Sequence, residues 1–244
     1  STFVRQAMDY AWDHGVTVAG SAADEAAFHP MLPAANPHNM YVNNVRMKAD
    51  SAEDAESFLQ MANCTNYQTR TDITVSATGC SSRALASMSG IAGLIVSASM
   101  VADGGDPIDP PLNGNEAYQI IVNTADDVHI PESYGEGADE TYWPMREGFD
   151  AFSGYGRVNA RSAVDVVLDG EIPPEADILS PEWFVTVDPE ETPELVVTGY
   201  ADARRAGSYT WSLQAAAGFE PAEADWFEVA SGGPSSEPLA GELG

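Results

Sequence analysis

Two adjacent serines, Ser81 and Ser82, stand where a short β-forming segment meets the longest nearly uncharged stretch of the chain. The alternating residues Thr71–Val75 predict a strand, and the small and apolar residues that follow the serines predict a buried helix. The serines then lie at the helix start, beside free backbone N–H groups and the positive end of the helix dipole. A hydroxyl in this position either caps the helix or acts as a nucleophile.

Four histidines are candidates for the base that such a nucleophile needs, but their surroundings favour other roles. His14 ends a predicted helix, where a cation near the C-terminus is ordinary. His29 and His38 flank a proline-rich loop, and His129 lies in an acidic loop. None has the spacing of a metal motif such as H-E-x-x-H. We therefore assign these histidines no catalytic role.

The elements that would position the serines are read from the hydrophobic spacing. Apolar residues near the start of the chain recur at helical spacing, and Gly15 follows as a stop signal. Further strands are expected over 16–20 and 40–45, and a further helix over 113–127.

The serine segment resembles the active-site motif of the subtilase family of serine peptidases, G-T-S-x-A-x-P-x-x-x-G. This similarity aligns Ser82 with the family's catalytic nucleophile. The matching positions around it are Ala84 and Gly90, and the differing positions are Cys80, Ser81 and Ala86.

Two other segments carry the same resemblance, in the same order as in the family. SAADE, residues 21–25, resembles the family's AAGNE and puts Asp24 at the asparagine of the oxyanion hole. GYGRVNARSAVDVV, residues 154–167, is similar to the GYGxVNAxxAV segment that closes many subtilase catalytic domains. The resemblance covers about residues 1–170. It implies an α/β fold, a partial subtilisin-like parallel sheet flanked by helices.

The resemblance also implies the reaction. A secreted serine-type endopeptidase would cleave protein or peptide substrates through an acyl-enzyme on Ser82, with the family's catalytic aspartate and histidine upstream of this chain. Asp24 would have to be neutral to serve the oxyanion, because an ionised carboxylate repels the developing negative charge. The alternatives are that Asp24 caps a following helix, DEAAF, and that the chain is a catalytically inactive binding or structural module. The inactive alternative is favoured by Arg83 directly after the nucleophile, by the altered G-T-S motif and by Asp24.

Cys64 and Cys80 are the only cysteines, and their spacing excludes a C-x-x-C metal site. An exported protein would join them in a disulfide, whereas an intracellular protein would leave two thiols. The resemblance to secreted peptidases favours the disulfide.

Two acidic segments interrupt the predicted core elements. Residues 49–60 are helix-prone and are expected to form a solvated surface insertion. The loop over 128–150 carries Tyr142, Trp143 and Phe149, which predict local core or the rim of a cleft. Calcium is a cofactor that the resemblance allows, but no Asp-x-Asp-x-Asp-Gly spacing places it.

Residues 171–244 form a second predicted domain, because prolines cluster near its start and apolar alternation then replaces helical spacing. Short strands are expected over 183–187, 195–200, 209–213 and 226–229, with Tyr209, Trp211 and Leu213 on one face. The pattern predicts a small all-β, sandwich-like accessory domain. Four strands are fewer than the roughly seven of an immunoglobulin-like sandwich, so we expect it to be truncated.

The charge is strongly one-sided, with 10 basic and 38 acidic residues and a net charge of −28. Such a chain repels phosphate backbones, which makes nucleic acid an improbable partner. No apolar run is long enough to span a membrane. The acidity is typical either of a protein kept soluble in high salt or of an ordinary acidic secreted protein.

We expect the melting temperature to rise when salt is raised from millimolar to molar concentration. Screening shortens the range of repulsion between surface carboxylates from about 10 Å at 0.1 M to about 3 Å at 1 M. Thermal melts over this range test the prediction. A flat or falling melting temperature would exclude the high-salt interpretation.

Overall fold

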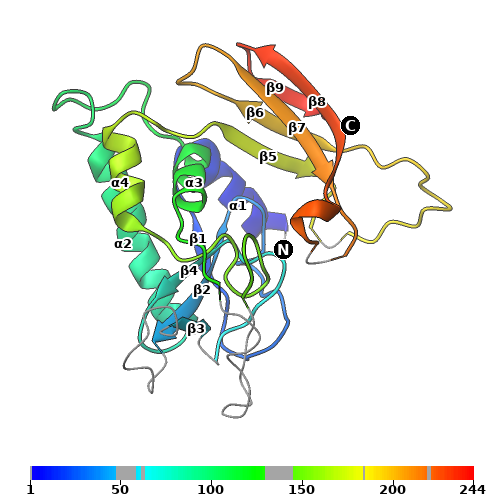
Figure 1. Ribbon diagram of the computed structural model, residues 1–244, viewed down its shortest axis with the longest axis horizontal. Helices are drawn as coiled ribbons and strands as arrows, with labels where there is room; N and C mark the ends of the chain where they lie inside the picture. Colours follow the sequence, from blue (N-terminus) through cyan, green and yellow to red (C-terminus); the bar gives the residue numbers. More distant parts are fainter. Residues whose placement is uncertain (1, 48–58, 62–63, 130–144, 184, 219–220) are drawn as a thin grey trace. The chain divides into compact units, whose positions relative to one another are not determined.

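The computed structural model describes residues 2–47, 59–61, 64–129, 145–183, 185–218 and 221–244. The chain divides into two compact units, Ser1–Glu171 and Ile172–Gly244 (Figure 1). Each unit is built around its own sheets.

A mostly parallel sheet organises the first unit. Its central strand, β2 (Met40–Met47), pairs in parallel with β1 (Ala19–Ser21) along one edge and with β4 (Ile73–Ser76) along the other. The short strand β3 (Leu59–Met61) pairs in antiparallel orientation with the last three residues of β2, which β1 does not reach. Strands at the centre of such a sheet are buried on both faces, which explains the continuous apolar character of Met40, Tyr41 and Val42.

Four helices accompany this sheet: α1 (Thr2–Asp13), α2 (Ser81–Ser99), α3 (Gly114–Asn123) and α4 (Ala160–Leu168). Helix α2 packs on β1, β2 and β4, and α4 lies beside α2 (Figure 1). The side chains of Ala84, Met88 and Ile95 form the buried face of α2. Strands and helices therefore confirm the α/β class that was predicted for residues 1–170.

Three expectations for the first unit need qualification. Residues 48–58 of the acidic insertion lie outside the described residues, and its end forms strand β3 rather than helix. Tyr142 and Trp143 also lie outside the described residues. From the same loop, Met145 is buried in a small cluster with Val45 and Val128. The helix that DEAAF would begin is absent, because residues 22–27 are irregular.

A buried ion pair joins the start of β4 to the rest of the unit. Arg70 donates from Nη1 to Asp72 Oδ1, and the Tyr118 hydroxyl on α3 donates to the same oxygen over 2.8 Å. The backbone N–H of Tyr41 on β2 donates to Asp72 Oδ2 over 2.6 Å. Burial, together with the Asp72 carboxylate, holds the pKa of Tyr118 well above its ordinary value, so this hydroxyl remains a donor. Hydrogen bonds to both carboxylate oxygens compensate the burial of the charge.

The GYGRVN segment runs alongside β4, and this close approach requires glycine at position 154. The backbone N–H of Tyr155 donates to the Asp72 carbonyl over 2.9 Å. A Cβ atom at Gly154 would lie 2.5 Å from that carbonyl oxygen, and Gly154 has a φ of +64°. Any side chain at this position would push the segment away from β4.

The second unit contains two antiparallel sheets among its described residues. Strands β5 (Glu175–Ser180), β6 (Thr198–Asp202) and β9 (Leu239–Glu242) form one, in the order β5-β6-β9. Strands β7 (Tyr209–Ala215) and β8 (Phe227–Ser235) form the other.

The strand predictions for this unit were partly wrong. Residues 185–187 are not a strand, and β5 and β9 were not predicted. Prolines on both sides of β5 concealed it, because a cluster of prolines predicts a linker and not a strand. The alternation in β7 is as predicted: Thr210 and Ser212 are exposed, Tyr209 and Trp211 are half-buried, and Leu213 is buried. The sandwich and its truncation stay predictions.

Asp150 predicts a measurable pH dependence of the free energy of unfolding. This side chain is 1% exposed, and burial raises its pKa from 3.8 to about 6, against the effect of hydrogen bonds from Ser153 and Phe152. Between these values the folded state keeps a proton that the unfolded state has lost. The free energy of unfolding should therefore fall by about 2 kcal/mol from pH 4 to pH 7 on this account.

Urea unfolding at four pH values from 4 to 7 measures this change. Asp150→Asn should remove this part of the slope, whereas Asp169→Asn, at an exposed helix end, should leave it intact. An unchanged slope in Asp150→Asn would show that other groups cause the pH dependence.

Candidate active site

Helix α2 begins at Ser81, and the two serines at its start have opposite surroundings. Ser81 is fully buried, and its hydroxyl lies 2.6 Å from Asp24 Oδ1 and 2.5 Å from Ser21 Oγ. Ser82 is exposed, and neither its hydroxyl nor its backbone N–H forms a hydrogen bond with any residue that the structure describes. Ser81 is therefore engaged in the structure, and Ser82 is available to a ligand.

Asp24 caps helix α2 from a distant part of the sequence. Its Oδ1 accepts from the backbone N–H of Ser81 over 3.1 Å as well as from the Ser81 hydroxyl. Cys80, the residue at the N-cap position, provides no side-chain hydrogen bond of its own. The Asp24 carboxylate thus takes over the capping role, and within the described chain its Oδ2 has no hydrogen bond.

Asn66 holds the loop that carries Asp24. It is fully buried, and its Oδ1 accepts from the backbone N–H of Glu25 over 2.9 Å. Its Nδ2 donates to Glu25 Oε2, and its backbone N–H donates to the Ala23 carbonyl. Ala23 and Ala26 have φ values of +71° and +54°, a region that side-chain-bearing residues rarely adopt. The hydrogen bonds of Asn66 stabilise this loop conformation.

Asn44 holds the turn that leads into α2. This residue of β2 is fully buried, and its Oδ1 accepts from the backbone N–H of Ala77 over 3.0 Å. Its Nδ2 donates to the carbonyls of Ala77 and Gly79. Gly79 has a φ of +106°, so the turn needs glycine here.

The sequence analysis missed both asparagines. The signal for Asn44 was present, because two adjacent asparagines interrupt the otherwise apolar centre of a buried strand. Nothing in the sequence distinguished Asn66 from a surface residue, since its role depends on a loop 41 residues away.

The predicted disulfide is confirmed. Cys64 and Cys80 are bonded, with 5.6 Å between their Cα atoms. The bond ties the residue before Ser81 to the segment that carries Asn66. The disulfide thereby connects the Asn66 segment, which holds the Asp24 loop, to the end of the turn that Asn44 holds.

The four histidines do not bond to either serine among the described residues. His14 Nδ1 lies 2.7 Å from the Tyr10 carbonyl and the ring stacks on Tyr10, as expected at a helix end. His38 pairs with Asp9 over 2.8 Å and stacks on Trp12. His29 and His129 are exposed.

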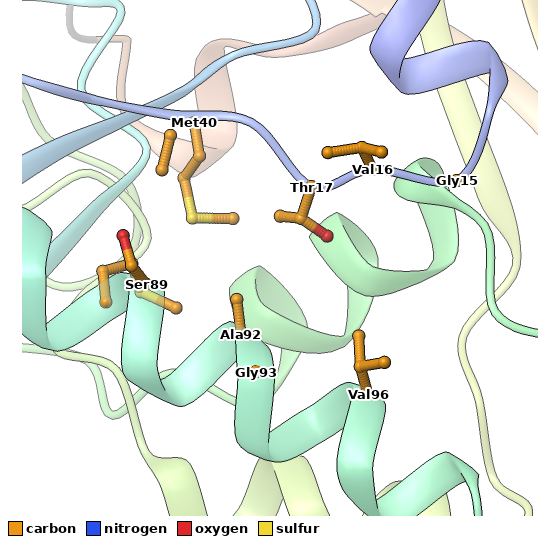
Figure 2. Close-up of a pocket in the computed structure, with 10 residues that line it drawn as sticks. Gly15, Val16, Thr17, Met40, Ser89, Ala92, Gly93 and Val96 are labelled. Carbon is orange, nitrogen blue, oxygen red and sulfur yellow. The ribbon is translucent and has the colours of Figure 1, made fainter.

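An open cavity of about 340 Å³ lies along α2, and Ser89 is among its lining residues (Figure 2). The side chains of Thr17, Met40, Ala92 and Val96 surround it, and neither Asp24 nor Ser82 contributes to its wall. No lining residue is titratable, so the cavity suits an apolar group and not a proton transfer.

Neither a metal centre nor a membrane span is found in the described part of the chain. No three His, Cys, Asp or Glu side chains gather there in a way that could hold a metal ion. No helix described by the structure combines the length and the hydropathy needed to cross a membrane.

No protein-family model matches the sequence, and no curated protein matches it. Solved structures show similarity at low sequence identity. A lanthipeptide protease is 18% identical with a TM-score of 0.47, over 66% of this chain and 54% of that one. The prenylagaramide maturation protease PagA is 14% identical with a TM-score of 0.48, over 70% of this chain and 56% of that one.

Fervidolysin from Fervidobacterium pennivorans, a keratinolytic enzyme related to subtilisin, is 17% identical with a TM-score of 0.48. That similarity covers 68% of this chain and 25% of fervidolysin. The chain spans about half the length of the first two structures. All three of these solved structures are proteases, and fervidolysin among them is related to subtilisin.

Proposed function

We propose that this chain is part of a serine endopeptidase of the subtilase type, with Ser82 as the nucleophile. One observation carries the proposal. Asp24 and the Ser81–Ser82 pair, the two places where the sequence resembles the subtilase active site, meet across 57 residues at the start of α2. The contact leaves the hydroxyl of Ser82 exposed.

The start of α2 offers what acyl transfer requires around the nucleophile. The unbonded N–H of Ser82 lies in the first turn of the helix, where the dipole favours negative charge. It would donate to the oxygen that becomes negative when Ser82 Oγ attacks a peptide carbonyl. A base removes the Ser82 proton, an acyl-enzyme forms as the amine leaves, and water then releases the acid.

The base is expected from a histidine that the subtilase resemblance places upstream of these residues. The disulfide supports export, because such bonds persist in oxidising compartments. Calcium stays a prediction, and no step of the proposed chemistry uses it.

Asp24 is proposed as the second oxyanion donor. Its Oδ1 is occupied by Ser81, which leaves Oδ2 to carry a proton toward the substrate oxygen. An asparagine could accept from Ser81 with Oδ1 and donate with its amide, so a protonated aspartate matches asparagine in both roles.

The alternative function is a binding module that keeps the fold without catalysis. The observation in its favour is that no histidine or carboxylate described by the structure bonds to the Ser82 hydroxyl. The experiment below separates the two functions.

In the longest natural protein that contains this chain, a fluorophosphonate probe should label Ser82 and no other serine of α2. Peptide mass mapping of the adduct measures this. Ser82→Ala should abolish labelling, and Ser87→Ala, exposed on the same helix, should preserve it. The isolated 244-residue chain should remain unlabelled, since serine without its base is a poor nucleophile. Labelling at Ser81, or none in the longer protein, would favour the binding module.

Asp24→Asn should keep or raise the rate of peptide cleavage and remove a loss of activity at higher pH. The reason is that an asparagine amide donates at every pH, whereas the aspartate donates only while it is protonated. Rate profiles of the two proteins against pH give the comparison.

Asp24→Ala is the matched control. It removes both donor and cap, so it should lower the rate and also destabilise the fold by about 1 to 2 kcal/mol. If Asp24→Asn leaves rate and pH profile unchanged, Asp24 is a cap alone.

A further inference from the structure

Arg83 differs from most arginines in this acidic chain. Five arginines pair with a carboxylate: Arg5 with Asp9, Arg70 with Asp72, Arg157 with Asp126, Arg161 with Asp165 and Arg204 with Glu175. Arg83 is exposed, and among the described residues its only side-chain hydrogen bond is to a neutral group, the Thr78 hydroxyl, 2.7 Å from Nη1. No carboxylate in the described part of the chain lies within ion-pair distance of it.

The side chain of Arg83 is held in place beside the nucleophile. Its Cδ lies 3.4 Å from the position that a Cβ of Gly79 would occupy, so the aliphatic part packs over the turn before α2. One guanidinium N–H binds Thr78, and four other N–H groups remain for a partner. Holding the charge in one place reduces the entropy lost when a ligand binds.

A guanidinium so placed suits a carboxylate. Its planar fork matches both carboxylate oxygens, and charge-assisted pairs of this kind are the strongest hydrogen bonds that side chains form. In a chain with a net charge of −28, an acidic ligand is otherwise repelled, so a fixed cation next to Ser82 favours it locally.

We propose that Arg83 selects peptide substrates with a carboxylate next to the scissile bond. The inference rests on the proposed function, because Ser82 must be the residue that attacks that bond. Because Arg83 follows Ser82 directly and is held over the turn before α2, we place its partner carboxylate on the residues that flank the attacked carbonyl. The carboxylate is supplied either by an Asp or Glu side chain or by the C-terminus of the substrate.

The test compares cleavage of matched peptides by the longest natural protein that contains this chain. One pair of peptides carries Glu or Gln at each position flanking the bond, and a second pair has a free or an amidated C-terminus one residue beyond it. We expect kcat/KM to be about 10-fold higher for the acidic member of one pair, the gain of a hydrogen bond to a charged group. The pair that shows the preference identifies the source of the carboxylate. In 1 M salt the preference should shrink.

Variants then assign the preference to Arg83. Arg83→Gln should reduce the ratio to about 1 with little change for the neutral peptide, and Arg83→Lys should give an intermediate ratio. Thr78→Val removes the hydrogen bond to Arg83 but keeps the charge, so it should retain most of the preference.

Three outcomes would overturn the proposal. Equal cleavage of acidic and neutral peptides by the unaltered protein would overturn it, and so would a preference that survives in Arg83→Gln. Equal losses on both peptides in Arg83→Gln and Thr78→Val would show that Arg83 only clamps the turn. All three outcomes leave the proposed endopeptidase function intact. If the protein cleaves no peptide and the fluorophosphonate labels no serine, both the endopeptidase function and the role of Arg83 are overturned.

Discussion

The contact between Asp24 and Ser81 is the interaction on which the arrangement of this site depends. A helix start leaves several backbone N–H groups without partners, and the residue preceding a helix usually satisfies one of them. Here the neighbouring residue is Cys80, which is committed to a disulfide, and a carboxylate from another loop provides the cap. The cap therefore joins the loop after β1 to the start of α2.

Three other features support that contact from different directions. Asn66 holds the loop of Asp24, Asn44 holds the turn before α2, and the disulfide links the segment of Asn66 to Cys80 at the end of that turn. Both asparagines are buried and bonded mainly to backbone groups. Loss of either would leave buried polar groups unsatisfied, which is costly inside a protein. Buried polar groups and a disulfide thus support the contact between Asp24 and Ser81.

The different roles of Ser81 and Ser82 follow from this arrangement. The hydroxyl and the backbone N–H of Ser81 both form hydrogen bonds with Asp24, so this cap sets the position of Ser81. Ser82 lies one residue further along the helix, about 100° around the axis, and faces outward. Arg83 continues the same exposed turn. The cap therefore positions the exposed side chains of Ser82 and Arg83 at the start of α2.

Sequence alone indicated most strands and helices of the first unit, because these are encoded by local spacing and by turn residues such as Gly15, but it did not predict β3. It also pointed to Ser82 and Asp24 through motifs. It did not predict β5 and β9, whose pairing depends on distant strands, nor the roles of Asn44 and Asn66. Only the tertiary structure decided which helix Asp24 caps. A carboxylate binds whichever N–H group the fold brings near it, and here that group lies 57 residues away.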